Sequence, residues 1–282
     1  MPEETTHQRL PRNFHRTFKP ERQYIHAMLR FAASGREGDA VAISEATGVP
    51  TGASTGKVPA ILDYCRGMGL IVLGGPERSA VKRPELTAFG RIVLSEDPYL
   101  ALGATQWIAH LNLCGSITGA DAWHRVFVDG THALGMRFER ERLEEYLGMT
   151  YRTAKGGLIG PMVGMYEDSA AFAACGALSE AEGVINRREA PLADEMGLGY
   201  GAWMLQLLKD HFPSRRQVPV TELDAAAGWR TIPGWNSSNL QRALELMSRK
   251  GLVEVDRHMD PWLVAPLADA EQAWRRIYED ML

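Results

Sequence analysis

The apolar positions in the first quarter of the chain recur at three- and four-residue steps. Over residues 20–33 this period predicts a helix with one buried face. A second, short helix is expected over 39–47, because Gly48 follows it and glycine commonly ends a helix. A third helix is expected to begin near Thr55 or Gly56, since Pro59 is tolerated only in a first helical turn.

A hairpin is expected after the third helix. Gly69 ends the helical pattern, and residues 70–73 and 85–87 are expected to pair as two strands around a loop that begins with Gly74. Three helices closed by a hairpin are typical of a winged-helix domain, a form of helix-turn-helix.

The same order of elements is expected near the C-terminal end. Aligning Gly69 with Gly251 superimposes the apolar positions of the two third helices. A last helix is expected over 269–282. The other elements expected in this second copy are three helices and two strands, at 203–208, 220–228, 240–247, 252–255 and 262–264.

Between the two copies the pattern predicts a mostly helical region. Helices are expected at 104–113, 120–128, 140–147 and 158–168, and residues 170–186 contain stretches that fit a strand or a loop. The fold class is therefore expected to be mainly α with small β-hairpins (α+β), with two winged-helix-like domains flanking a helical middle domain. The expected parts are a disordered or basic arm, an N-terminal winged helix, the helical middle domain and a C-terminal winged-helix-like domain, at 1–13, 14–97, 98–195 and 196–282.

Composition and charge limit the possible partners. The formal net charge of -4 excludes attraction of the whole chain to DNA, so a nucleic-acid surface must be local. No apolar run reaches the roughly 20 residues of a membrane span, and three scattered cysteines are typical of buried thiols in a reducing compartment. We therefore expect a cytoplasmic protein without a membrane partner.

The candidate DNA contacts lie at the starts of the third helices, in the basic N-terminal stretch and in the first hairpin. Lys57 is expected to lie opposite the buried stripe of its helix, free to meet a phosphate. The alternative for the hydroxyl and amide residues is ordinary helix capping. The candidates are Arg16, Lys19, Ser54, Thr55, Lys57, Arg66, Arg78, Lys82 and Arg83 in the first copy, and Asn236, Asn239 and Arg242 in the second.

The two copies differ in the charge of their hairpins. The second carries Glu254, Asp256 and Asp260 against Arg257 alone, which would repel a phosphate backbone. We therefore expect the first copy to read DNA and the second to serve as a dimer or partner interface. Arg230, Arg242 and Arg249 keep a DNA role open for the second copy.

Candidate catalytic chemistry is sparse. The chain has no phosphate-binding loop, HExxH, GxSxG or CxxC motif. The set His110, Cys114, His124 and His132 matches no zinc spacing, and His110 is more typical of a hydrogen-bonded core histidine. Two acidic pairs, Glu167–Asp168 and Asp121 with Asp129, could hold a divalent ion, although solvent-facing acids are the commoner interpretation.

Six short segments together resemble a bacterial family that includes the SspB-type proteins of the Ssp DNA-phosphorothioation defence system. The resemblance extends from Phe14 to Asp168 and weakens afterwards. The segments are residues 14–22 (FHRTFKPER), 51–57 (TGASTGK), 64–70 (YCRGMGL), 86–90 (LTAFG), 96–98 (EDP) and 105–111 (TQWIAHL).

This resemblance implies a DNA-binding role in phosphorothioate modification and phage defence, in which one strand is nicked for sulfur insertion. It also implies a divalent metal, Mg or Mn, for a nickase, and partners that include a cysteine desulfurase, an ATPase and a sulfurtransferase-like protein. It assigns no catalytic or metal-binding residue. The alternatives are a non-catalytic DNA-binding adaptor or transcription regulator, which needs no cofactor, and a protein-interaction scaffold that pairs through its winged helices, for example as a homodimer.

Overall fold

The computed structural model describes residues 9–51, 56–76, 79–152, 157–258 and 260–281. Across these ranges the protein is a mixed α+β structure in which helices predominate and short strands form small antiparallel sheets. No helix within them has the length and apolar character needed to cross a membrane.

The first unit, defined here as α1 to α3 with β1 and β2, has the element order expected from the sequence. Asp39 begins α2 by accepting bonds from the amides of Val41 and Ala42, and Gly48 ends it at a φ of 70°. The unit continues into α4, a helix that the sequence patterns did not reveal. The elements are α1 (Arg22–Ala33), α2 (Ala40–Thr47), α3 (Lys57–Gly67), β1 (Ile71–Gly74), β2 (Arg83–Leu86) and α4 (Ala88–Glu96).

The middle region is less purely helical than expected, because it contains a three-stranded sheet in the order β3-β5-β4. The helix expected over 120–128 is divided into a short α-helix and a π-helix. The elements are α5 (Gly103–Leu113), α6 (Asp121–His124), the π-helix η1 (Arg125–Asp129), α7 (Thr131–Leu134), β3 (Arg137–Glu139), α8 (Arg140–Tyr151), α9 (Ile159–Glu167), β4 (Leu178–Ala181) and β5 (Val184–Arg187).

The second unit, defined here as α10 to α12 with β7 and β8, repeats the order of the first. A short strand, β6, joins its hairpin in the order β6-β8-β7. The elements from there to the C-terminus are η2 (Asp194–Met196), α10 (Gly197–His211), β6 (Val218–Pro219), α11 (Val220–Ala227), α12 (Ser237–Arg249), β7 (Val253–Asp256), β8 (Leu263–Pro266) and α13 (Ala270–Trp274).

The helix expected over 269–282 is shorter than predicted, since α13 ends at Trp274. After it the backbone closes tight turns, in which the amides of Arg275, Arg276 and Glu279 each bond to a carbonyl three residues earlier. Ile277 and Tyr278 are nevertheless buried, which accounts for the apolar pattern that suggested a longer helix.

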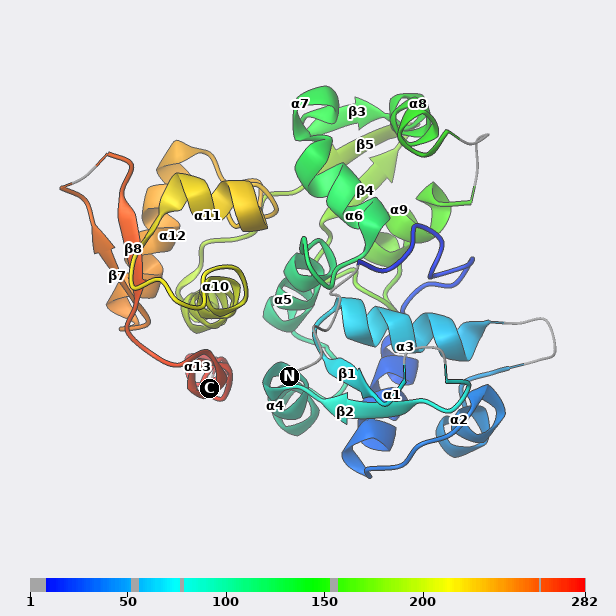
Figure 1. The fold of residues 1–282 in the computed structure, drawn as a ribbon. Coiled ribbons are helices and arrows are strands. Elements are labelled where there is room, and N and C mark those ends of the chain that lie inside the picture. Colours follow the sequence, from blue (N-terminus) through cyan, green and yellow to red (C-terminus); the bar gives the residue numbers. More distant parts are fainter. Residues whose placement is uncertain (1–8, 52–55, 77–78, 153–156, 259, 282) are drawn as a thin grey trace.

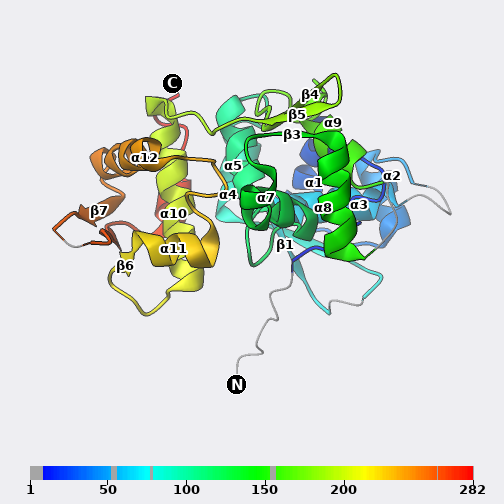
Figure 2. The same cartoon turned by 90° about the horizontal axis from the view of Figure 1, so that it is seen from above.

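In Figure 1 the second unit lies on the left, the first unit at the lower right, and most of the middle region above the first unit. Seen from above, α10, α11 and α12 are grouped at one end, with α4 and α5 between them and the first unit (Figure 2). The second unit is joined to the rest where α10 packs against α5 and α13 against α4. One buried hydrophobic cluster extends through all three parts, so the division at residues 97 and 195 stays a prediction.

Residues 1–13 were expected to form a disordered or basic arm. Residues 1–8 lie outside the described ranges, but the part from Arg9 is fixed to the middle region. Leu10 is buried, its amide donates to the carbonyl of Gly119, and its carbonyl accepts from the amide of Asp121. The guanidinium of Arg9 lies 3.1 Å from the carboxylate of Asp121. Arg9 and Leu10 are therefore held against the middle region.

Candidate nucleic-acid interface

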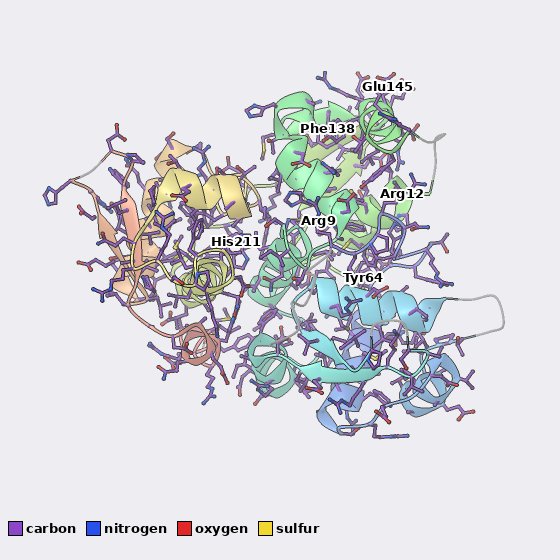
Figure 3. The ribbon with its side chains drawn as sticks, viewed as in Figure 1. Arg9, Arg12, Tyr64, Phe138, Glu145 and His211 are labelled. Atoms are coloured by element: carbon purple, nitrogen blue, oxygen red, sulfur yellow. The ribbon has the colours of Figure 1, made fainter. Side chains whose placement is uncertain are left out.

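The third helix of the first unit, α3, is covered over most of its surface, although its half-buried residues Pro59, Asp63 and Arg66 line a cleft beside the hairpin. Tyr64 lies where α3 meets the middle region (Figure 3), with ring centroids 4.8 Å from Phe14 and 6.2 Å from Trp123. No residue of α3, all of which are described, is exposed. The seven buried ones are Val58, Ala60, Ile61, Leu62, Tyr64, Cys65 and Gly67. A recognition helix, by contrast, presents an exposed face to a DNA groove.

Lys57, the central candidate of the first unit, does not lie free opposite the buried stripe. Its ammonium pairs with Glu21 at 2.7 Å and lies 4.3 Å from the ring centre of Tyr24. Only 14% of the side chain is exposed. The expectation of a free lysine was wrong because Glu21 and Tyr24, at the start of α1, lie beside the start of α3.

Most other described candidates of the first unit also have acidic partners. The ammonium of Lys19 pairs with Asp168, Arg66 pairs with Asp63 at 3.0 Å, and Arg83 pairs with Glu85 at 2.9 Å. Lys82 is half-buried and its backbone bonds to Gly38. Ser54, Thr55 and Arg78 lie outside the described residues.

Arg16 is exposed and adopts a φ of 56°. Its guanidinium lies against Gly56, where an added Cβ would come within 2.1 Å of it. Glycine at this position therefore allows Arg16 to lie against the residue that precedes α3. The structure thus gathers Arg16, Lys57 and Glu21 at the start of α3.

The third helix of the second unit, α12, has one open face. Asn236 caps it by accepting a bond from the amide of Asn239, as the capping alternative predicts. The side chain of Asn239 donates to Glu189 at 2.7 Å. Arg242 is exposed and has no ion-pair partner among the residues described. Among the described candidates, Arg16 and Arg242 are therefore the charged residues that are exposed and form no ion pair with another described residue.

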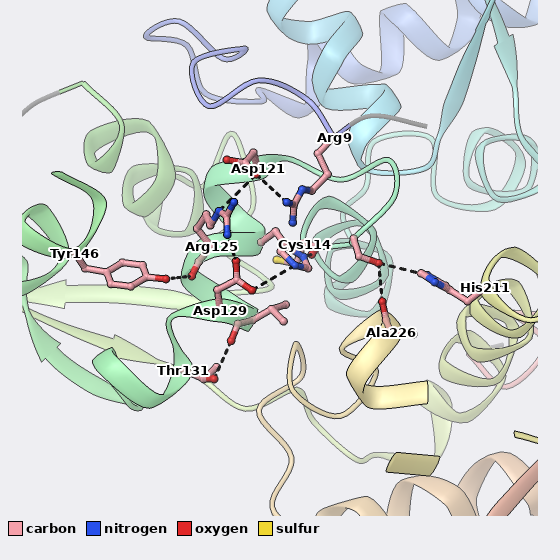
Figure 4. Close-up of polar contacts among 12 residues, drawn as sticks. Arg9, Cys114, Asp121, Arg125, Asp129, Thr131, Tyr146, His211 and Ala226 are labelled. Atoms are coloured by element: carbon pink, nitrogen blue, oxygen red, sulfur yellow. Dashed lines mark hydrogen bonds and ion pairs between the residues drawn. The ribbon is translucent and has the colours of Figure 1, made fainter. Parts of the chain in front are cut away.

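A cluster of polar side chains lies on α6 and the π-helix η1 of the middle region (Figure 4). Asp121 lies between Arg9 and Arg125, and Asp129 pairs with Arg125 at 2.5 Å. His124 places Nδ1 2.9 Å from the carbonyl oxygen of Cys114, and burial lowers its pKa. The carboxylates of Asp121 and Asp129 are thus neutralised by guanidinium groups.

The other candidate metal ligands are also engaged in the fold. His110 is fully buried with Nδ1 2.6 Å from the hydroxyl of Tyr166, and burial lowers its pKa to about 3. This is the hydrogen-bonded core histidine expected as the alternative to a ligand. Glu167 accepts a bond from the amide of Glu180, and Asp168 pairs with Lys19. Within the described ranges no three His, Cys, Asp or Glu residues are arranged to hold a metal ion, so these donors do not fit a divalent site.

A cleft of about 1100 Å³ separates the hairpin of the first unit from α10. Its lining includes Arg66, Lys82, Asn112, Ser116 and His211. Ser116 donates to the carbonyl of Ala226 at 3.1 Å and lies 3.4 Å from Nε2 of His211, which connects the middle region with the second unit. Sequence patterns gave no sign of this cleft, because its residues come from segments far apart in the chain.

Comparison with known proteins gives a match in structure rather than in sequence. A crystal structure of SspB matches with a TM-score of 0.70 at 16% identity, and a magnesium ion-bound SspB crystal structure matches with a TM-score of 0.67 at 15% identity. Each match covers 95% of this chain and 87% of the other. The chain has the fold of SspB. No protein-family profile and no curated protein matches the sequence.

Proposed function

We propose that this protein is the DNA-binding component of an Ssp-type phosphorothioate modification and phage-defence system. The observation that carries the proposal is the match to SspB over 95% of the chain, which includes both helical units and the middle region. The six short segments between residues 14 and 111 that resemble SspB-type proteins point to the same role.

The finer assignment of the two units as winged helices belongs to this proposal. Each has three helices followed by an antiparallel hairpin, in the order that winged-helix domains share. Binding to duplex DNA is tested by fluorescence anisotropy at low and moderate salt. The proposal expects an affinity that falls steeply with salt, because phosphate contacts release counterions. Absence of binding at low salt would overturn it.

The proposed activity is nicking of one strand before sulfur insertion, supported by magnesium or manganese. The magnesium ion in one SspB structure supports the choice of metal. Purified protein is incubated with supercoiled plasmid and either metal, with and without chelator. Relaxed circles that disappear with chelator are expected, and plasmid that stays supercoiled would contradict nicking.

The second candidate is a DNA-binding adaptor or transcription regulator without catalysis. The pairing of Asp121 and Asp129 with arginines favours it, because among the described residues these carboxylates belong to no group of three ligands that could hold a metal ion. A mobility shift of the plasmid without relaxation would support this candidate over the nickase.

The proposed protein partners are a cysteine desulfurase, an ATPase and a sulfurtransferase-like protein of the same system. Co-purification of each with this chain, compared in the presence and absence of DNA, tests for direct contact. Light scattering of the purified chain tests the proposed homodimer, for which a mass of about 31.2 kDa would indicate a monomer instead.

A further inference from the structure

The exposed face of α12 carries two arginines. Counting charged residues along the sequence of the second unit does not show that they share this face. The inward face holds Ala243, Leu244, Leu246 and Met247. Arg242 and Arg249 are exposed and lie seven residues apart, which is about two helical turns and about 10.5 Å along the axis. This distance along the helix axis is close to the rise of three nucleotides along the DNA axis, at about 3.4 Å each.

A third guanidinium completes a concave surface with these two. Arg257 follows β7 and lies 5.1 Å from the ring centre of Trp262, which supports it from the hairpin. Arg242, Arg249 and Arg257 line one hollow of about 760 Å³, together with Asp194 and Glu245. We call this surface the arginine hollow.

The carboxylates in the arginine hollow are themselves solvated. Arg249 lies 3.3 Å from Asp194, whose side chain is 64% exposed. Arg257 lies 3.2 Å from Glu245, whose side chain is 53% exposed. Arg242 has no ion-pair partner within the described chain. Because solvent-exposed ion pairs are weak and screened by salt, a phosphate can replace the carboxylate at either arginine.

We propose that the arginine hollow binds the phosphate backbone of duplex DNA. The planar guanidinium matches two phosphate oxygens at once, and three such groups from a helix and a hairpin follow a strand rather than a single small anion. The inference rests on the proposed DNA-binding function and places its phosphate contacts on the second unit. The second hairpin is acidic in sequence, but its acidic residues Glu254 and Asp256 do not line the hollow. The negative charge of the hairpin therefore does not argue against phosphate binding there.

The first test removes positive charge from the hollow. The double variant Arg242→Ala/Arg249→Ala should weaken duplex affinity roughly tenfold, equally for unrelated sequences, and lower the slope of log affinity against log salt by about 2. Arg36→Ala is the matched control, since Arg36 is an exposed arginine on the first unit. The control should leave both quantities unchanged.

The second test removes a negative charge from the arginine hollow. Glu245→Gln frees Arg257 from its partner without changing side-chain volume, so duplex affinity should rise roughly threefold. A misfolded protein does not bind more tightly, so a gain here separates charge from folding. Circular dichroism melting of all variants completes the comparison.

The outcomes distinguish this inference from the function on which it rests. If the wild type binds no duplex at low salt, the proposed function fails. If the wild type binds but both the arginine variant and Glu245→Gln bind equally well, the DNA contacts lie elsewhere and the arginine hollow is not one of them. If Arg36→Ala weakened duplex affinity as much as the Arg242→Ala/Arg249→Ala variant does, the assignment of the phosphate contacts to the arginine hollow would also fail.

Discussion

In the first unit α3 lies between its own helices and the middle region, whereas in the second unit α12 keeps one face open to solvent. The two helices occupy the same place in the same order of elements. Their surroundings differ because Phe14 and Trp123, from outside the repeated pattern, pack on Tyr64 of α3. Equivalent elements in a repeated fold therefore need not present equivalent surfaces, and charge along the sequence does not show which copy is accessible.

The largest expected effect is the loss of the aromatic contacts that cover α3. Tyr64→Ala should lower the free energy of unfolding by about 3–5 kcal/mol, the range for large aromatic side chains in a core. Ser248→Ala, on the exposed face of α12, should change it by less than about 0.5 kcal/mol. Urea denaturation measures both. Equal, small effects would show that α3 is as accessible as α12.

The hydroxyl of Tyr64 can be separated from its ring. It donates to the carbonyl of Phe18 at 3.1 Å, so Tyr64→Phe removes this bond and keeps the aromatic packing. The expected loss is about 1 kcal/mol, the net contribution of one hydrogen bond. A loss as large as that of Tyr64→Ala would mean that the ring contributes little.

Acid should affect the surroundings of the first unit through His15. This side chain is fully buried beside Phe14 and Trp123, and burial lowers its pKa to about 4. Between about pH 6.5 and 4 the unfolded chain binds a proton that the folded His15 does not, so stability falls as pH falls. At pH 5 the loss is on the order of 2 kcal/mol.

His15→Phe tests this effect in the same protein. Stability measured between pH 7 and pH 5 should fall less in the variant, because the ionisable ring is gone and the aromatic volume remains. Hydrogen exchange at pH 5 should also increase more in α3 than in α12 in the wild type. An unchanged pH dependence in the variant would exclude His15 as a source of the acid sensitivity.

Lys57 gives a smaller effect that distinguishes a structural lysine from a DNA contact. Lys57→Ala leaves Glu21 half-buried without its partner, and the expected loss of stability is about 1–2 kcal/mol, between the values for exposed and buried pairs. Duplex affinity, measured where the variant is folded, should stay within twofold. A large loss of affinity at unchanged stability would restore Lys57 as a phosphate contact.

Local patterns in the sequence predicted most of the elements that surround the candidate site. The stop at Gly48 and the inward stripe of α12 follow from local physical rules, and both are confirmed. The three-residue strand β3 and the helix α4 were missed, because β3 is too short to show a period and α4 follows directly on a strand. The covering of α3 was also missed, since it depends on Trp123, some 60 residues away along the chain.

The smallest expected effect is that of removing charge from the first hairpin on the salt dependence of duplex affinity. It is compared with the effect of removing charge from the arginine hollow. Substituting Lys82 and Arg83 with alanine should change the slope of log affinity against log salt by less than about 1, because the proposed phosphate contacts lie on the second unit and Lys82 is half-buried. The double variant in the arginine hollow removes the same formal charge and should change the slope by about 2. Equal slopes for the two variants would show that both hairpins meet the DNA backbone. A larger change for the first hairpin would reverse the assignment and make the basic loop of the first unit the main phosphate contact.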